Sequence, residues 1–146
     1  MSYLDDLSLS FDPVTRIAEL SALKVLSICS KKELNTLCSD TGVLLNRVVG
    51  DERCYLAVDI GKIVIDPGLA DEYAQKVEEL KSRFLFPGGL VRYGYEITRV
   101  TIKLVGLKTG ELPVLFNKRD DAIKYLTQLS EIGLINTDKS NVAIPE

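Results

Sequence analysis

The stretch RCYLAVDIGKIVIDPGLADEYAQKVEELKSRF, residues 53–84, contains two β-rich runs followed by the clearest amphipathic helix of the chain. The runs Arg53–Asp59 and Lys62–Asp66 are separated by Ile60-Gly61, and Asp66-Pro67-Gly68 closes the second run with residues that favour turns. Apolar side chains then recur at helical spacing, at Leu69, Tyr73, Val77, Leu80 and Phe84. The stretch therefore predicts two strands and a helix over residues 69–84.

On the N-terminal side of this stretch, the sequence predicts two helices that form a corner. Asp12-Pro13 provides the N-cap and the first-turn proline of a helix, and the apolar residues after it cover more than one face. Ser30 and Glu33 have the spacing of a capping box, which predicts a second, shorter helix that ends at Thr41-Gly42. The run Val43–Val49 is β-rich, and we expect it to complete a three-stranded antiparallel meander with the two later strands.

On the C-terminal side, strands followed by a helix are predicted a second time. Side chains alternate over residues 91–97 and again over 100–104, while Pro113 makes Leu112–Phe116 an edge strand. Asn117 is a suitable N-cap for a last helix that ends at Gly133. Because the strands are grouped between helices, the predicted fold class is α+β, with an N-terminal helical corner and a largely antiparallel sheet built from two three-stranded units, each followed by a helix. We expect a single domain over residues 12–146, preceded by a tail over residues 1–11.

The composition excludes several classes of function. The chain has 146 residues, no histidine, three cysteines and a net charge of −3. Histidine is the commonest metal ligand and general base, and the cysteines lack metal-binding spacing, so we expect no catalytic residue, no metal and no cofactor. The acidic balance disfavours a nucleic-acid partner. No apolar run approaches the roughly 20 residues of a membrane-spanning helix, so we expect a cytoplasmic protein with no membrane partner.

By elimination, the sequence favours a non-catalytic protein that binds a partner or itself and acts as a regulator. Apolar residues alternate with polar ones along the expected tail, and the expected first helix is apolar over more than one face. Either feature is suited to covering a neighbouring subunit. We therefore predict a protein-interaction surface, with a homo-oligomer as one form of it, at Leu4, Leu7, Leu9, Phe11, Leu20 and Leu23.

An alternative function comes from a resemblance carried by the segment from Cys54 to Pro67. This segment resembles the strand pair of papain-like and transglutaminase-like proteins, in which a glycine-containing turn joins two strands and an acidic residue before proline ends the second. Asp66-Pro67 fits that acidic position, and Cys29 or Cys38 on a preceding helix fits the nucleophile. Arg53 or Cys54 stands in place of the family's activating histidine. The resemblance implies an inactive or unconventional cysteine hydrolase with a thiol site formed by Cys29 or Cys38 and Asp66.

A second alternative is a weak single-stranded nucleic-acid binder. Basic and aromatic residues interleave as they do on platforms for stacked bases, at Arg92, Tyr93, Tyr95, Arg99 and Lys103. Strand alternation places the two tyrosines on one face with apolar neighbours, which favours a core or interface surface instead.

Overall fold

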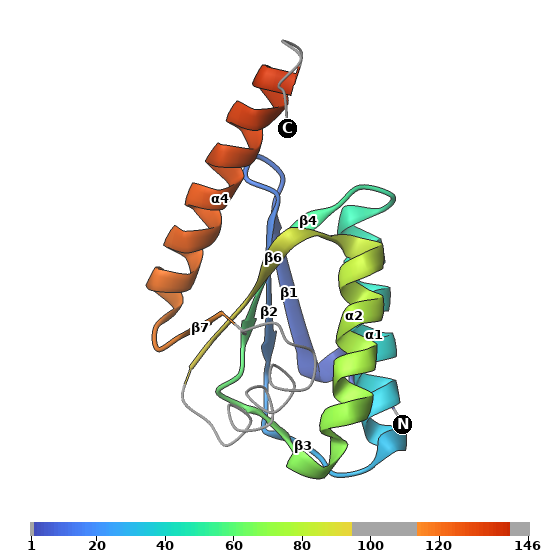
Figure 1. Cartoon of the computed structure of the whole chain (residues 1–146). Helices are drawn as coiled ribbons and strands as arrows, with labels where there is room; N and C mark the ends of the chain where they lie inside the picture. Colours follow the sequence, from blue (N-terminus) through green and yellow to red (C-terminus); the bar gives the residue numbers. More distant parts are fainter. Residues whose placement is uncertain (1, 95–113, 141–146) are drawn as a thin grey trace.

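The computed structural model describes residues 2–94 and 114–140, which form a sheet with helices on both faces (Figure 1). The strands of the sheet lie in the order β1 (Leu7–Asp12), β2 (Ile17–Ala22), β4 (Cys54–Asp59), β6 (Leu85–Tyr93) and β7 (Leu115–Phe116). Helices α1 (Lys31–Val49) and α2 (Ala70–Phe84) cover one face, and α4 (Arg119–Ser140) lies against the other. The expected α+β class is confirmed.

The strand pairing differs from the expected antiparallel sheet. Among the described strands of this sheet, only β1 and β2 pair antiparallel, as a hairpin, whereas β2 with β4, β4 with β6 and β6 with β7 are parallel. The chain returns from β2 to β4 through α1 and from β4 to β6 through α2, as parallel pairing requires. Each of the first two crossovers also contains a short strand, β3 (Leu26–Ile28) or β5 (Ile63–Ile65), and these two strands pair in parallel as a separate sheet. The first predicted three-stranded antiparallel unit is therefore wrong. In the second unit, the described strands β6 and β7 pair in parallel instead of antiparallel, and the rest of the unit lies outside the described residues.

The N-terminal helical corner is also wrong, because residues 17–22 form strand β2. Ala18, Leu20 and Ala22 belong to the core beneath α1 and α2, while Ile17 belongs to the core beneath α4. Apolar and polar residues alternate from Ala18 to Ala22, as in a strand, but the apolar residues on either side of this run also fit a wide helical stripe. Asp12-Pro13 starts a turn instead of a helix: the Asp12 carboxylate accepts a hydrogen bond from the backbone N–H of Val14 at 2.9 Å.

Residues 43–49, expected to be a strand, form the C-terminal half of α1. The buried residues of α1 keep a helical spacing past the glycine that we expected to end the helix, from Leu34 to Val49. Ser30 caps the helix as predicted, since its Oγ accepts the backbone N–H of Glu33 at 3.2 Å. Gly50, with φ of 65°, follows the last residue of the helix.

The elements of residues 53–84 are confirmed as individual elements. β4, β5 and α2 lie where expected, and a short 3₁₀ helix, η2 (Pro67–Leu69), occupies the predicted turn. The last helix begins at Arg119 and continues beyond Gly133 to Ser140. Of the strand expected over residues 91–97, the first residues belong to β6 (Leu85–Tyr93). Its end, the strand expected over 100–104 and the start of the strand expected over 112–116 lie outside the described residues.

The expected tail is part of the sheet. The 3₁₀ helix η1 (Leu4–Asp6) leads into β1, so the boundary expected after residue 11 falls inside a strand. Two hydrophobic cores lie on the two sides of the sheet, the larger beneath α1 and α2 and the smaller beneath α4. Within residues 2–94 and 114–140, no helix combines the length and the apolar character that crossing a membrane requires.

Candidate functional site

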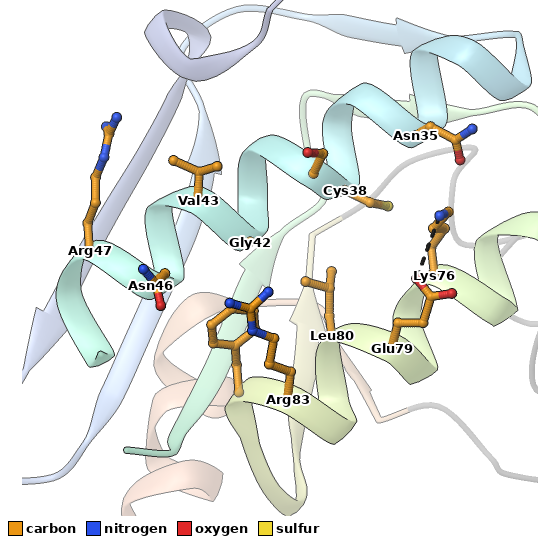
Figure 2. Close-up of a pocket in the computed structure, with 12 residues that line it drawn as sticks. Asn35, Cys38, Gly42, Val43, Asn46, Arg47, Lys76, Glu79, Leu80 and Arg83 are labelled. Carbon is orange, nitrogen blue, oxygen red and sulfur yellow. Dashed lines mark ion pairs between the residues drawn. The ribbon is translucent and has the colours of Figure 1, made fainter. Parts of the chain in front are cut away.

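A groove of about 520 Å³ lies between α1 and α2 on the outer side of the helical layer (Figure 2). Its floor is apolar and comes from both helices. Its walls are mostly polar or charged, and they include three cationic side chains distributed along the groove. The floor residues are Cys38, Gly42, Leu80 and Phe84, and the wall residues are Asn35, Ser39, Val43, Asn46, Arg47, Lys76, Glu79 and Arg83.

Gly42 lies on the floor of the groove, where the two helices come close together. A Cβ atom built on Gly42 lies 3.6 Å from Leu80 and 3.7 Å from Phe84, so α2 packs directly against the glycine. Val43, the next residue, is 39 % exposed and presents an aliphatic side chain at the wall of the groove. The groove thus combines an apolar centre with a polar border, as binding sites commonly do.

The electrostatics of the groove oppose those of the whole chain. Three cations, Arg47, Lys76 and Arg83, line it together with a single carboxylate, Glu79, whereas the net charge of the chain is −3. Lys76 and Glu79 form an ion pair of 3.6 Å, which Figure 2 shows as a dashed line. The guanidinium of Arg83 lies 4.8 Å from the ring centroid of Phe84. The groove is therefore suited to a negatively charged ligand.

The expected thiol site is only partly assembled. Ile28 pairs with Ile65, and the backbone N–H of Asp66 donates to the Ile28 carbonyl at 3.0 Å, which brings the residue after β3, Cys29, to the same sheet end as Asp66. The Asp66 carboxylate caps η2 by accepting the Gly68 N–H at 2.8 Å. Cys38, in contrast, lines the groove, and burial raises the pKa of its thiol to about 11. A thiol so held is protonated at neutral pH and is a poor nucleophile.

The predicted protein-interaction residues separate into buried and exposed members. Leu7 and Leu20 are 6 % and 5 % exposed and belong to the chain's own core, so their prediction as docking residues is wrong. Leu9 and Phe11 are half-buried against the same core. Leu4 is half-buried in η1, whereas Leu23 is 61 % exposed and stays a predicted contact residue.

The predicted nucleic-acid face is not formed by the residues that the structure describes. Arg92 and Tyr93 point to opposite faces of β6, and they are 6 % and 9 % exposed. Neither side chain presents a stacking surface to solvent, so this prediction is wrong for both. Tyr95, Arg99 and Lys103 lie outside the described residues. Among residues 2–94 and 114–140, no cluster of three or more histidine, cysteine or acidic side chains is placed to hold a metal ion.

A solved structure shares this fold. The crystal structure of an anti-sigma factor antagonist from Mycobacterium paratuberculosis matches with a TM-score of 0.55 and 16 % sequence identity, over 86 % of this chain and 98 % of that chain. An uncharacterised protein with a SpoIIAA-like fold from Shewanella loihica matches with a TM-score of 0.45 and 12 % identity, over 82 % of this chain and 93 % of that chain. The sequence matches no protein-family model, and no curated protein matches it significantly. The first match establishes the fold alone.

Proposed function

We propose that this chain is a non-catalytic regulatory protein that acts by binding a protein partner in the groove between α1 and α2. The groove carries the proposal, because it combines an exposed aliphatic wall at Val43 with three cations on an otherwise acidic chain. The fold supports it, since the matched structure belongs to an anti-sigma factor antagonist, a protein named for its action on another protein.

The shape and charge of the groove favour an acidic amphipathic segment as its ligand. Helix α1 has 19 residues, and at about 1.5 Å per residue it spans roughly 28 Å. A partner helix laid along such a groove places apolar side chains against Val43 and Leu80. Its acidic residues then face Arg47 and Arg83 at the walls, where opposite charges speed association and select the partner.

The experiment begins with a photo-crosslinking amino acid at position 43, in the wall of the groove. The crosslinked protein is identified, purified and titrated against the wild-type chain by calorimetry. The double variant Arg47→Glu/Arg83→Glu reverses the charge of the groove without changing its apolar floor. The matched control, Lys118→Glu/Lys124→Glu, makes the same change in net charge at exposed positions near the start of α4, across the sheet.

We expect the groove variant to bind the partner at least tenfold more weakly, and the α4 control to bind within twofold of the wild type. The affinity of the wild type should also fall as salt is raised, because exposed charges are screened. Equal binding by the wild type and the groove variant would show that the groove is not the docking site. The proposal would also be contradicted if every protein that crosslinks to position 43 of the wild type crosslinks to the groove variant as well, or if no protein crosslinks at all.

A second copy of this chain is the alternative partner, favoured by a different surface. Leu23 and Val25 are 61 % and 65 % exposed on the turn between β2 and β3, away from both hydrophobic cores. Covering these two side chains is a reason for self-association. Sedimentation velocity of the wild type and of Leu23→Asp tests this: a concentration-dependent dimer that the variant abolishes supports it, and a wild-type monomer at high concentration ends it.

A further inference from the structure

Arg92 is a buried cation whose hydrogen-bond partner is the neutral side chain of Tyr73. It lies on β6 beneath α2, it is 6 % exposed, and its Nη2 donates to the Tyr73 hydroxyl at 3.2 Å. The guanidinium carbon also lies 5.7 Å from the centroid of the Tyr73 ring. Within residues 2–94 and 114–140, no carboxylate forms an ion pair with Arg92. Burying a guanidinium is costly, and none of the described carboxylates compensates this one, so Arg92 favours an anion beside it.

Arg92 lines an apolar cavity of about 70 Å³ between the sheet and the two helices. Aliphatic side chains from both helices and from strands of both sheets surround the space, among them Leu37 of α1, Val77 of α2 and Leu56 of β4. The charged side chains in the described lining are Lys81, which pairs with Glu78 at 3.2 Å, and Arg92. The cavity therefore joins a hydrocarbon-lined space to a guanidinium that lacks a described carboxylate partner.

We propose that this cavity binds a short-chain aliphatic carboxylate. The two carboxylate oxygens match the planar fork of the Arg92 guanidinium, and the hydrocarbon tail fills the space between the leucine and valine side chains. Inorganic phosphate suits the site less well, because its other oxygens would meet aliphatic carbon and lose their hydrogen bonds to water.

The volume sets the length of the tail. An engineered cavity of about 150 Å³ holds benzene, which has six carbons, so a cavity about half that size takes about three or four carbons. Butanoate and pentanoate are therefore the expected ligands. Longer chains would have to displace packed side chains, and interiors resist such displacement.

The cavity and the α1–α2 groove share two residues, Cys38 and Leu80. The cavity does not depend on the proposed function of the groove, but the shared cysteine supplies a probe of its occupancy. Cys38 is 8 % exposed and Cys54 is fully buried, whereas Cys29 is exposed. Replacing Cys29 by serine therefore leaves Cys38 as the more accessible of the two remaining thiols.

The experiment titrates the full chain with acetate, butanoate, pentanoate, hexanoate and octanoate, with butan-1-ol and butylammonium as controls of matched length. We expect amide chemical shifts to report the tightest binding for butanoate or pentanoate, and at least tenfold weaker binding for the alcohol and the amine. In the Arg92→Met variant, which keeps a long side chain, butanoate should bind no better than butan-1-ol.

A second measurement decides the question if Arg92→Met fails to fold. In the Cys29→Ser chain, saturating butanoate should slow the reaction of Cys38 with a disulfide reagent at least threefold, while acetate leaves the rate unchanged. The proposal is overturned if tail length has no effect on binding, if Arg92→Met keeps the preference for carboxylate, or if butanoate leaves Cys38 unprotected. These outcomes are independent of whether a protein binds the outer groove.

Discussion

Arg119 and Glu19 form a two-pronged ion pair that joins residues 100 positions apart. Nε of Arg119 lies 2.6 Å from one carboxylate oxygen of Glu19, and Nη2 lies 2.8 Å from the other. The pair connects the first residue of α4 to β2, and the hydrogen bonds to Glu19 raise the pKa of the Arg119 guanidinium. It therefore fixes where α4 begins against the sheet.

We expect Arg119→Met to lower the free energy of unfolding by about 0.5–1 kcal/mol. The estimate is small because Arg119 is 53 % exposed and water screens surface pairs, although two-pronged geometry places this pair near the upper end of their range. Urea unfolding of Arg119→Met, Glu19→Gln and the double variant measures the coupling between the two residues. If the two single effects add fully in the double variant, the pair contributes nothing to stability.

Leu7 and Leu23 offer a comparison between a core position and a surface position from the same predicted interaction set. Leu7→Ala should lower the free energy of unfolding by about 2–4 kcal/mol, because the side chain lies in the core beneath α1 and α2. Leu23→Ala should change it by less than about 0.5 kcal/mol, because the side chain is exposed.

Deleting residues 1–11 removes nearly all of β1, so the truncated chain should lose cooperative unfolding. A truncated chain as stable as the wild type would show that β1 is dispensable.

The sequence predicted individual elements well where one face of each element is exposed. Helix α2 keeps charged residues on its outer side, so its apolar spacing was visible. In β2, apolar and polar residues do alternate from Ala18 to Ala22, but this short run lies within a longer apolar stretch that also fits a wide helical stripe. Missing β2 hid the first crossover, through α1. The elements of the second crossover, β4, α2 and β6, were predicted, but they were assigned to two separate antiparallel units.

The candidate sites depend on contacts that no local pattern contains. Gly42 stopped the predicted helix, although in the structure it permits the close approach of Leu80 and Phe84. The groove exists only because α1 continues past this glycine. Arg92 was visible as a basic residue among aromatics, but its burial against Tyr73 depends on the packing of α2 over β6. Two helices separated by residues 50–69 cannot be placed side by side from spacing alone.

Two glycines should respond oppositely to substitution by alanine. A Cβ atom on Gly89 would lie 2.8 Å from the Phe86 carbonyl oxygen and 3.1 Å from the Tyr55 ring, so Gly89→Ala should cost about 1–3 kcal/mol of unfolding free energy. Gly42→Ala makes only ordinary contacts and should add about 0.5–1 kcal/mol, because alanine favours the helical conformation. Urea unfolding of the two variants checks both signs. A destabilised Gly42→Ala variant would contradict the packing described for α1 and α2.

The buried thiols of Cys38 and Cys54 should make the fold sensitive to alkaline pH. Burial raises the pKa of each thiol from 9.0 to about 11. The folded state therefore keeps both protons between about pH 9 and pH 11, while the unfolded state releases them. Stability is fully present below pH 9 and is lost as pH rises toward 11, by up to about 1.4 kcal/mol per pH unit for each group.

The measurement is urea unfolding between pH 8 and pH 10, which stays below most of the titration of Tyr93, whose pKa burial raises to about 12. The wild type should lose stability across this range, and Cys38→Ala/Cys54→Ala should lose less, even though its stability at pH 8 is lower. Cys29→Ala is the matched control, because this thiol is exposed, and it should follow the wild-type slope. If the unfolding free energy changes equally with pH in the double variant and in the wild type, burial does not raise the pKa of the two thiols. The packing assigned to Cys38 between groove and cavity must then be revised.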